Sequence, residues 1–163
     1  MKAAFGLGAN LGDRARTLSR GVELLGLRLG RLVRASSVFE SEALVLPGDD
    51  PLSAPKFLNA AAVFETECMP REMLGIIRDV ERELGRRREL ERKRWQPRLI
   101  DIDLLAIEDI VVNEDGFTVP HPELPRRMFV LEPLAEVWPD WRHPVLGKSI
   151  DELIEALQRP GGA

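Results

Sequence analysis

The sequence predicts an α+β fold with one antiparallel sheet, and three observations lead to that prediction. Short apolar runs alternate with two amphipathic segments in the order strand, helix, strand, strand, helix, strand. The chain has 163 residues, 44% of them hydrophobic, which suits one domain with a sizeable core. The sequence contains no internal repeat that would indicate another architecture. The order of the elements is that of the ferredoxin-like βαββαβ unit, with both helices on one face of the sheet.

The first half of the chain supplies a strand, a helix and a second strand. Lys2–Leu7 is a short apolar run that is ended by glycines. Asp13 or Thr17 begins a helix that ends at Gly30. Its apolar residues share one face: Leu18, Val22, Leu25 and Leu29. Leu32–Glu40 alternates loosely between apolar and polar residues, which predicts the second strand.

The next segment completes the predicted unit. Phe57–Thr66 is short and apolar, which predicts a strand. Pro70 suits the first turn of the second helix, and Gly85 ends that helix. Its buried face consists of Met73, Ile77, Val80 and Leu84. Leu99–Ile107 is the last strand of the unit.

The C-terminal part adds a hairpin and helices. Ile110–Val112 and Phe117–Val119 flank a turn that contains glycine. A short helix is expected near Phe129–Val137, and Ile150–Leu157 has the pattern of an amphipathic helix.

Two long connections, residues 41–56 and 85–98, are unusual in a compact domain and suggest binding loops or lids. The net charge is −4, yet residues 85–98 carry +5 and the rest of the chain −9. A cationic loop that leads into a strand with two carboxylates suits metal–triphosphate chemistry. A solvated run of charges or an RNA-binding patch is the alternative interpretation of the loop.

The sharpest chemical signal is the pair Asp101 and Asp103 in the predicted last strand. Because alternate residues of a strand share a face, Ile100, Ile102 and Leu104 should point to the core and the two aspartates away from it, about 6–7 Å apart. Two like charges side by side repel, and a divalent cation turns that repulsion into binding. A solvated strand face is the simpler alternative.

Composition limits the classes of protein. The single cysteine excludes an internal disulfide and fits a reducing, cytoplasmic location. No run of residues approaches the roughly 18 apolar residues of a membrane span. The acidic balance argues against a general nucleic-acid binder.

Other polar residues stand out from their surroundings. Asn59 lies inside an apolar strand, where its amide needs partners and could recognise a polar heterocycle. Trp95 lies in the charged loop and is either a packing anchor or a stacking surface. The segment 6–12 lacks the third glycine of a dinucleotide fingerprint, so we expect it to be a turn that presents Asn10 at the end of the sheet.

These pieces occur in the order of a known family. From about Lys2 to about Ile154 the chain resembles 6-hydroxymethyl-7,8-dihydropterin pyrophosphokinase of folate biosynthesis. The most specific part of the resemblance is Arg94-Trp95-Gln96-Pro97-Arg98-Leu99-Ile100-Asp101-Ile102-Asp103-Leu104-Leu105. Independent support comes from Gly8-Ala9-Asn10-Leu11-Gly12-Asp13, Phe57-Leu58-Asn59-Ala60 and Val119-Pro120-His121-Pro122.

The resemblance implies transfer of a pyrophosphoryl group from ATP to the hydroxymethyl oxygen of the dihydropterin, with release of AMP. It implies a single pyrophosphokinase domain over residues 1–163, a monomer, and two magnesium ions held by Asp101 and Asp103. The implied catalytic residues are Arg86, Arg88, Arg94, Arg98, Asp101 and Asp103. The implied pterin-binding residues are Asn10, Ser41, Glu42, Leu44, Phe57, Asn59, Trp95 and Phe129. The implied ATP-binding residues are Glu81, Arg94, Arg98, His121 and Arg127.

Two other functions stay open at this point. Another two-metal phosphoryl or nucleotidyl transferase of ferredoxin-like fold could carry the same aspartates. The pterin-side residues Phe57, Asn59 and Phe129 discriminate between that enzyme and the pyrophosphokinase. A ferredoxin-like RNA-binding module is the third hypothesis, and the net charge of −4 argues against it.

Overall fold

The structure is a computed structural model that describes residues 1–42, 47, 48, 50, 56–87, 89 and 99–160. Within these residues, one antiparallel sheet has the strand order β2-β4-β1-β5, with β3 paired to β4. The strands are β1 (Lys2–Ala9), β2 (Gly30–Ala35), β3 (Phe39–Ser41), β4 (Phe57–Thr66) and β5 (Asp101–Ile107). The helices are α1 (Arg14–Leu29), α2 (Pro70–Glu83), α3 (Met128–Val137) and α4 (Ile150–Gln158). A separate hairpin joins β6 (Val112–Glu114) to β7 (Phe117–Val119).

The arrangement of the strands confirms the predicted ferredoxin-like fold. β1 lies between β4 and β5 and is antiparallel to both. The register places Gly8 opposite Asn59 on one side and opposite Asp101 on the other. Gly6 likewise lies opposite Asp103. The sheet therefore brings together segments that are about a hundred residues apart in the chain.

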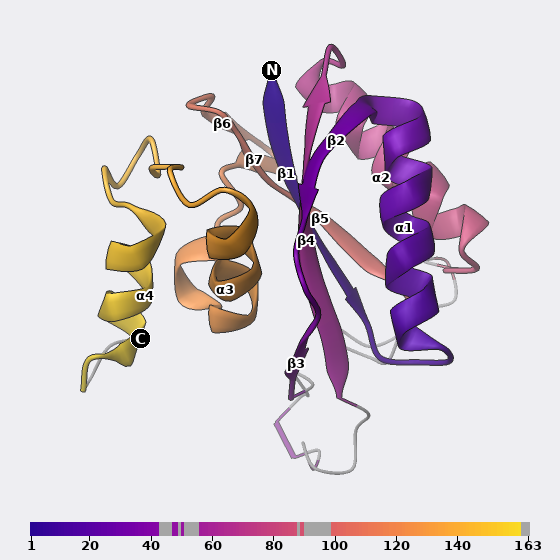
Figure 1. The fold of residues 1–163 in the computed structure, drawn as a ribbon, viewed down its shortest axis with the longest axis horizontal. Helices are drawn as coiled ribbons and strands as arrows, with labels where there is room; N and C mark the ends of the chain where they lie inside the picture. Colours follow the sequence, from indigo (N-terminus) through magenta and orange to yellow (C-terminus); the bar gives the residue numbers. More distant parts are fainter. Residues whose placement is uncertain (43–46, 49, 51–55, 88, 90–98, 161–163) are drawn as a thin grey trace.

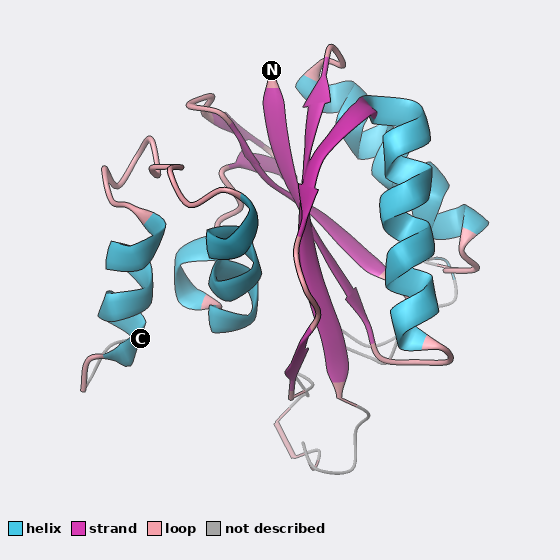
Figure 2. Ribbon diagram, in the orientation of Figure 1, coloured by secondary structure: helices cyan, strands magenta, loops and turns pink. Residues whose placement is uncertain are grey.

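Helices cover both faces of the sheet (Figures 1 and 2). α1 and α2 pack on one face, as predicted, around a core that includes Phe5, Leu25 and Phe64. α3 packs on the other face and α4 packs against α3, so that Leu105, Leu131 and Ile150 belong to a second core. Burial of these apolar faces provides the main stabilisation of the fold. No helix in the described part of the chain has the length and apolar character required to cross a membrane.

Local chemistry explains the ends of α1. The Asp13 carboxylate accepts a hydrogen bond from Arg16 N at 3.2 Å, so Asp13 and not Thr17 is the N-cap. The helix ends at Leu29, and Gly30 has φ of +137°. A β-carbon at Gly30 would lie 2.4 Å from the Glu65 carbonyl oxygen, so only glycine fits where the helix turns directly into β2.

The predicted single strand Leu32–Glu40 is wrong, because the chain forms two strands there, β2 and β3. Both pair with β4, and Ser36 lies between them. The Ser36 hydroxyl accepts a hydrogen bond from Ala61 N at 2.8 Å, and Ser37 N donates to the Glu136 carboxylate at 2.9 Å. Ser36 N still donates to Ala61 O at 2.8 Å, but the return bond from Ala61 N goes to the Ser36 side chain instead of a backbone carbonyl, and the strand is interrupted there.

Candidate active site

Asp101 and Asp103 project from β5 on the face that α3 covers. Ile100, Ile102 and Leu104 are buried in the core between the sheet and helices α1 and α2. The two aspartate side chains keep 31% and 35% of their surface exposed. The predicted division of the strand between core residues and carboxylates is therefore confirmed.

The electrostatics of this pair favour a cation. Burial and, after it, the negative charge of the neighbouring Asp101 raise the pKa of Asp103 to about 7, against the opposing positive charge of Arg127. The described residues contain no group of three or more His, Cys, Asp or Glu side chains arranged to hold a metal ion. Two carboxylates fit Mg²⁺, because this ion keeps several water ligands and binds substrate phosphates in addition to one or two carboxylates.

A buried ion network lies behind Asp101. Arg86 Nη1 donates to Glu81 Oε2 at 2.7 Å and to Asp101 Oδ1 at 3.0 Å. The same Glu81 oxygen accepts a hydrogen bond from Ile102 N at 2.9 Å. The side chains of Glu81 and Arg86 are only 2% and 3% exposed, so both charges depend on these partners.

His121 approaches the aspartates from the end of the hairpin. Its Nε2 lies 3.8 Å from Asp103 Oδ1, and its Nδ1 accepts a hydrogen bond from Glu123 N at 3.1 Å. Burial lowers the pKa of His121, and the positive charge of Arg127 lowers it further. Because Nδ1 accepts a hydrogen bond, the neutral ring carries its proton on Nε2, which faces Asp103.

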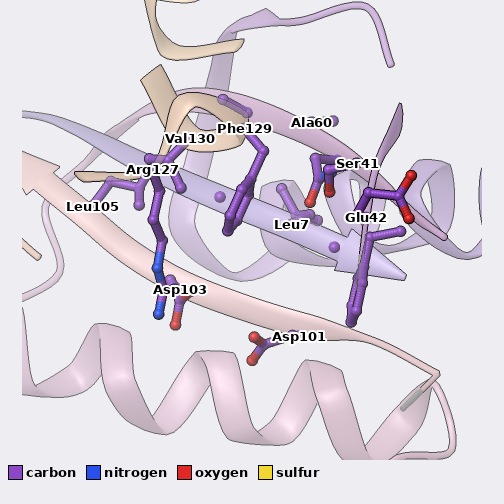
Figure 3. A pocket seen from close by; sticks show the side chains of 15 residues that line it. Leu7, Ser41, Glu42, Ala60, Asp101, Asp103, Leu105, Arg127, Phe129 and Val130 are labelled. Carbon is purple, nitrogen blue, oxygen red and sulfur yellow. The ribbon is translucent and has the colours of Figure 1, made fainter. Parts of the chain in front are cut away.

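Above the sheet lies a cavity that we call the aromatic cavity. The predicted residues that line it are Ser41, Glu42, Phe57, Asn59, Asp101, Asp103, Arg127 and Phe129. In Figure 3, Phe129 projects into its centre, with Arg127 and Asp103 on one side and Ser41 and Glu42 on the other. Asn59 Nδ2 donates to Ser41 Oγ at 2.7 Å and to Phe39 O at 3.3 Å, which fixes the orientation of the amide.

A second cavity, the hairpin cleft, lies on the other side of Asp103. It is lined by residues of α2, β5 and the hairpin: Leu74, Ile77, Arg78, Ile102, Asp103, Leu104, Gly116, Phe117, Thr118, Val119, His121 and Pro122. Asp103 lines both cavities. Molecules bound in the aromatic cavity and in the hairpin cleft would therefore meet at this carboxylate.

The other predicted site residues lie elsewhere. Glu81 and Arg86 form the network behind Asp101 and do not belong to the lining of either cavity. Asn10 is buried, and it also does not belong to the lining of either cavity. Leu44, Arg88, Arg94, Trp95 and Arg98 lie outside the described residues.

Several lining residues were missed by sequence reasoning. The sequence predicts that glycines end β1, but the strand continues to Ala9 and places Gly6 and Gly8 on the floor of the aromatic cavity. A β-carbon at Gly8 would lie 3.3 Å from Asn59 Oδ1, so the missing side chain keeps the floor open. Glycine inside a strand is a known signal of such close approach. The residues of α2 in the hairpin cleft, such as Leu74, gave no comparable signal.

Curated relatives of the chain are pyrophosphokinases, a class of transferases. Residues 4–139 match the model of the family described as 7,8-dihydro-6-hydroxymethylpterin-pyrophosphokinase (HPPK). The chain belongs to this family.

Individual relatives agree with this assignment. The chain is 37% identical to the 2-amino-4-hydroxy-6-hydroxymethyldihydropteridine pyrophosphokinase of Methylorubrum extorquens over 98% of this chain and 96% of that one. It is also 37% identical to the enzyme of the same name from Aquifex aeolicus, over 91% and 87% of the two chains. The crystal structure of wild-type Plasmodium falciparum HPPK-DHPS has the same fold, with a TM-score of 0.73 and 15% identity. That match covers 94% of this chain and 44% of the solved one.

Proposed function

We propose that this protein transfers the pyrophosphoryl group of ATP to the hydroxymethyl oxygen of 6-hydroxymethyl-7,8-dihydropterin and releases AMP. The hydroxyl oxygen forms a bond to the β-phosphorus, the bond from that phosphorus to the bridging α-phosphate oxygen breaks, and the hydroxyl proton passes to solvent. The observation that carries the proposal is that the aromatic cavity and the hairpin cleft share Asp103. Two substrates that must react with each other need such a meeting point.

The pterin is assigned to the aromatic cavity. Phe57 and Phe129 offer faces on which a flat ring can stack, and the oriented amide of Asn59 can hydrogen-bond to a ring edge. Ser41 and Glu42 supply further polar groups at the same end. The occurrence of these residues in one cavity favours a pterin enzyme over another two-metal transferase.

The nucleotide is assigned to the hairpin cleft. Apolar side chains such as Leu74 and Phe117 can pack against a base, and His121 lies where the cleft reaches Asp103. Arg127 carries its guanidinium over the Phe129 ring, 5.7 Å from the ring centre, and lines the aromatic cavity, from which it would bind the transferred phosphates.

Asp101 and Asp103 would hold two magnesium ions. When bound, these ions would neutralise negative charge on the phosphates of ATP and lower the pKa of the attacking hydroxyl. Arg86 would add positive charge from the network behind Asp101. We assign catalytic roles toward the phosphates to Arg88, Arg94 and Arg98, and pterin binding to Trp95.

The proposal extends to the whole chain. Residues 1–163 would form a single pyrophosphokinase domain, because both cores share one sheet. The protein would act as a monomer in the cytoplasm, where the free Cys68 stays reduced. Its partners would be ATP and the pterin, with no nucleic acid or membrane involved.

The test is an assay of nucleotide products. With ATP, Mg²⁺ and 6-hydroxymethyl-7,8-dihydropterin, we expect AMP and the pyrophosphorylated pterin in equal amounts. Without the pterin, we expect almost no AMP. ADP as the product, or no turnover of this pterin, would contradict the proposal.

A further inference from the structure

The carboxylate of Glu81 holds the backbone of β5 at a point between the two aspartates. Glu81 comes from the last turn of α2, and its side chain is 2% exposed. Its Oε2 accepts the hydrogen bond of Ile102 N, and Ile102 is the residue that separates Asp101 from Asp103. Since side chains alternate along a strand, a shift of the backbone at this position moves both aspartates.

Glu81 Oε2 also accepts a hydrogen bond from the buried Arg86, which therefore has two negative partners, Glu81 and Asp101. Arg86 Nη1 also donates to Ile100 O at 3.2 Å, so the guanidinium is held against the start of β5 as well as against Glu81 and Asp101. A metal ion bound by Asp101 would compete with Arg86 for the negative charge of this carboxylate. When Asp101 binds a cation instead of Arg86, the Glu81 carboxylate still supplies a negative charge to Arg86.

We propose that Glu81 is a positioning residue for the metal-binding carboxylates: it fixes the strand between them and supplies the countercharge that lets Asp101 exchange Arg86 for a divalent cation. The proposal rests on one part of the proposed function, the binding of metal by Asp101 and Asp103, and not on the identity of the substrates. It gives Glu81 a role that requires no contact with ATP.

Metal affinity is the direct test. Mn²⁺ is titrated into the protein with α,β-methylene-ATP present, and bound Mn²⁺ is followed by electron paramagnetic resonance. In Glu81→Gln the side-chain shape is kept and the charge is lost, so that more of the countercharge of Arg86 must come from Asp101. We expect Mn²⁺ to bind about tenfold more weakly in this variant, since a buried charge that loses a partner holds its remaining partner more tightly.

A matched control is available two residues further along the chain. Glu83 forms an exposed ion pair with Arg28 at 2.7 Å and lines neither cavity. Glu83→Gln makes the same chemical change, and we expect it to leave Mn²⁺ affinity unchanged. If Glu81→Gln does not fold, Glu81→Asp is titrated in its place. Because it keeps the charge on a shorter side chain, its Mn²⁺ affinity should fall by about threefold, less than the tenfold loss expected for a lost charge.

Steady-state kinetics provide a second measurement. Glu81→Gln should need about tenfold more Mg²⁺ for half-maximal rate, while kcat at saturating Mg²⁺ stays within about threefold of the wild type. Unchanged Mn²⁺ affinity in Glu81→Gln would overturn the proposal. So would a raised KM for ATP at saturating metal without a change in metal affinity. Weaker Mn²⁺ binding in a protein that fails the AMP assay would refute the proposed function and leave the role of Glu81 standing.

Discussion

Asp103 connects the electrostatics of the site to the stability of the protein. Its pKa in the folded state is about 7, above the ordinary value of 3.8, chiefly because of burial. A raised folded pKa means that the contribution of this group to stability is complete below pH 3.8 and is lost as the pH rises through 7. A divalent cation that binds the ionised carboxylate opposes this loss.

Magnesium should therefore stabilise the protein in a pH-dependent way. In the presence of α,β-methylene-ATP, Mg²⁺ should raise the melting temperature more at pH 8 than at pH 5, where Asp103 holds a proton. Asp103→Asn should remove this difference and lower turnover by at least about a hundredfold. Thermal unfolding with and without Mg²⁺ at both pH values checks the prediction. Asp140→Asn, at an exposed position, is the control. An equal gain at both pH values would contradict the assignment.

At the scale of elements, the junction of α1 and β2 depends on one glycine. A β-carbon at Gly30 would lie 2.4 Å from Glu65 O, and the backbone there has φ of +137°. Gly30→Ala should lower the free energy of unfolding by about 2 kcal/mol, because both the contact and the conformation are unfavourable.

The contrasting variant lies in α2. A β-carbon at Gly75 would meet nothing within 4 Å, so Gly75→Ala should raise the free energy of unfolding by up to about 1 kcal/mol through better helix propensity. Urea unfolding of both variants measures the two effects. A Gly30→Ala protein as stable as the wild type would show that the junction relaxes.

Elements and site residues were predictable where the signal is local. The period of two in Leu99–Ile107 was enough to separate Asp101 and Asp103 from the core residues, and Asp13 and Gly30 marked the ends of α1 correctly. The break at Ser36 was not predictable, because the partner of its hydroxyl lies in β4 and comes 25 residues later. The same holds for the bond between Glu81 and Ile102 N, because Ile102 comes 21 residues later in the chain.

At the scale of the molecule, the layer beyond α3 contains a group that responds to pH. The His143 ring packs edge-on against Trp141, with ring centres 5.5 Å apart. Its Nδ1 accepts hydrogen bonds from Val145 N and Leu146 N at 3.2 and 3.1 Å. Burial lowers the pKa of His143 below 6.5, so its contribution to stability is present above pH 6.5 and is lost as the pH falls through the lowered value.

Replacement of this histidine should flatten the response to acid. In His143→Asn the amide oxygen can accept the same backbone hydrogen bonds without titrating. We expect the free energy of unfolding to fall less steeply between pH 6.5 and 5 in this variant than in the wild type. Because the pKa of His121 is also lowered, the free energy of unfolding of His143→Asn should still decrease to some extent as the pH falls. Denaturant unfolding across this pH range measures the slopes, and identical slopes would rule out His143 as the titrating group.

The position of β1 in the sheet also has a consequence for synthesis. Lys2–Ala9 pairs with Phe57–Thr66 on one side and with Asp101–Ile107 on the other. β1 is the first strand to be synthesised, but it can pair along both edges only after the ribosome has made residue 107. α2 and the pairing of β3 with β4 involve shorter loops and should form earlier. Because Asp101 and Asp103 reach Gly8 and Gly6 only when this last strand docks, partly made chains should have no working active site.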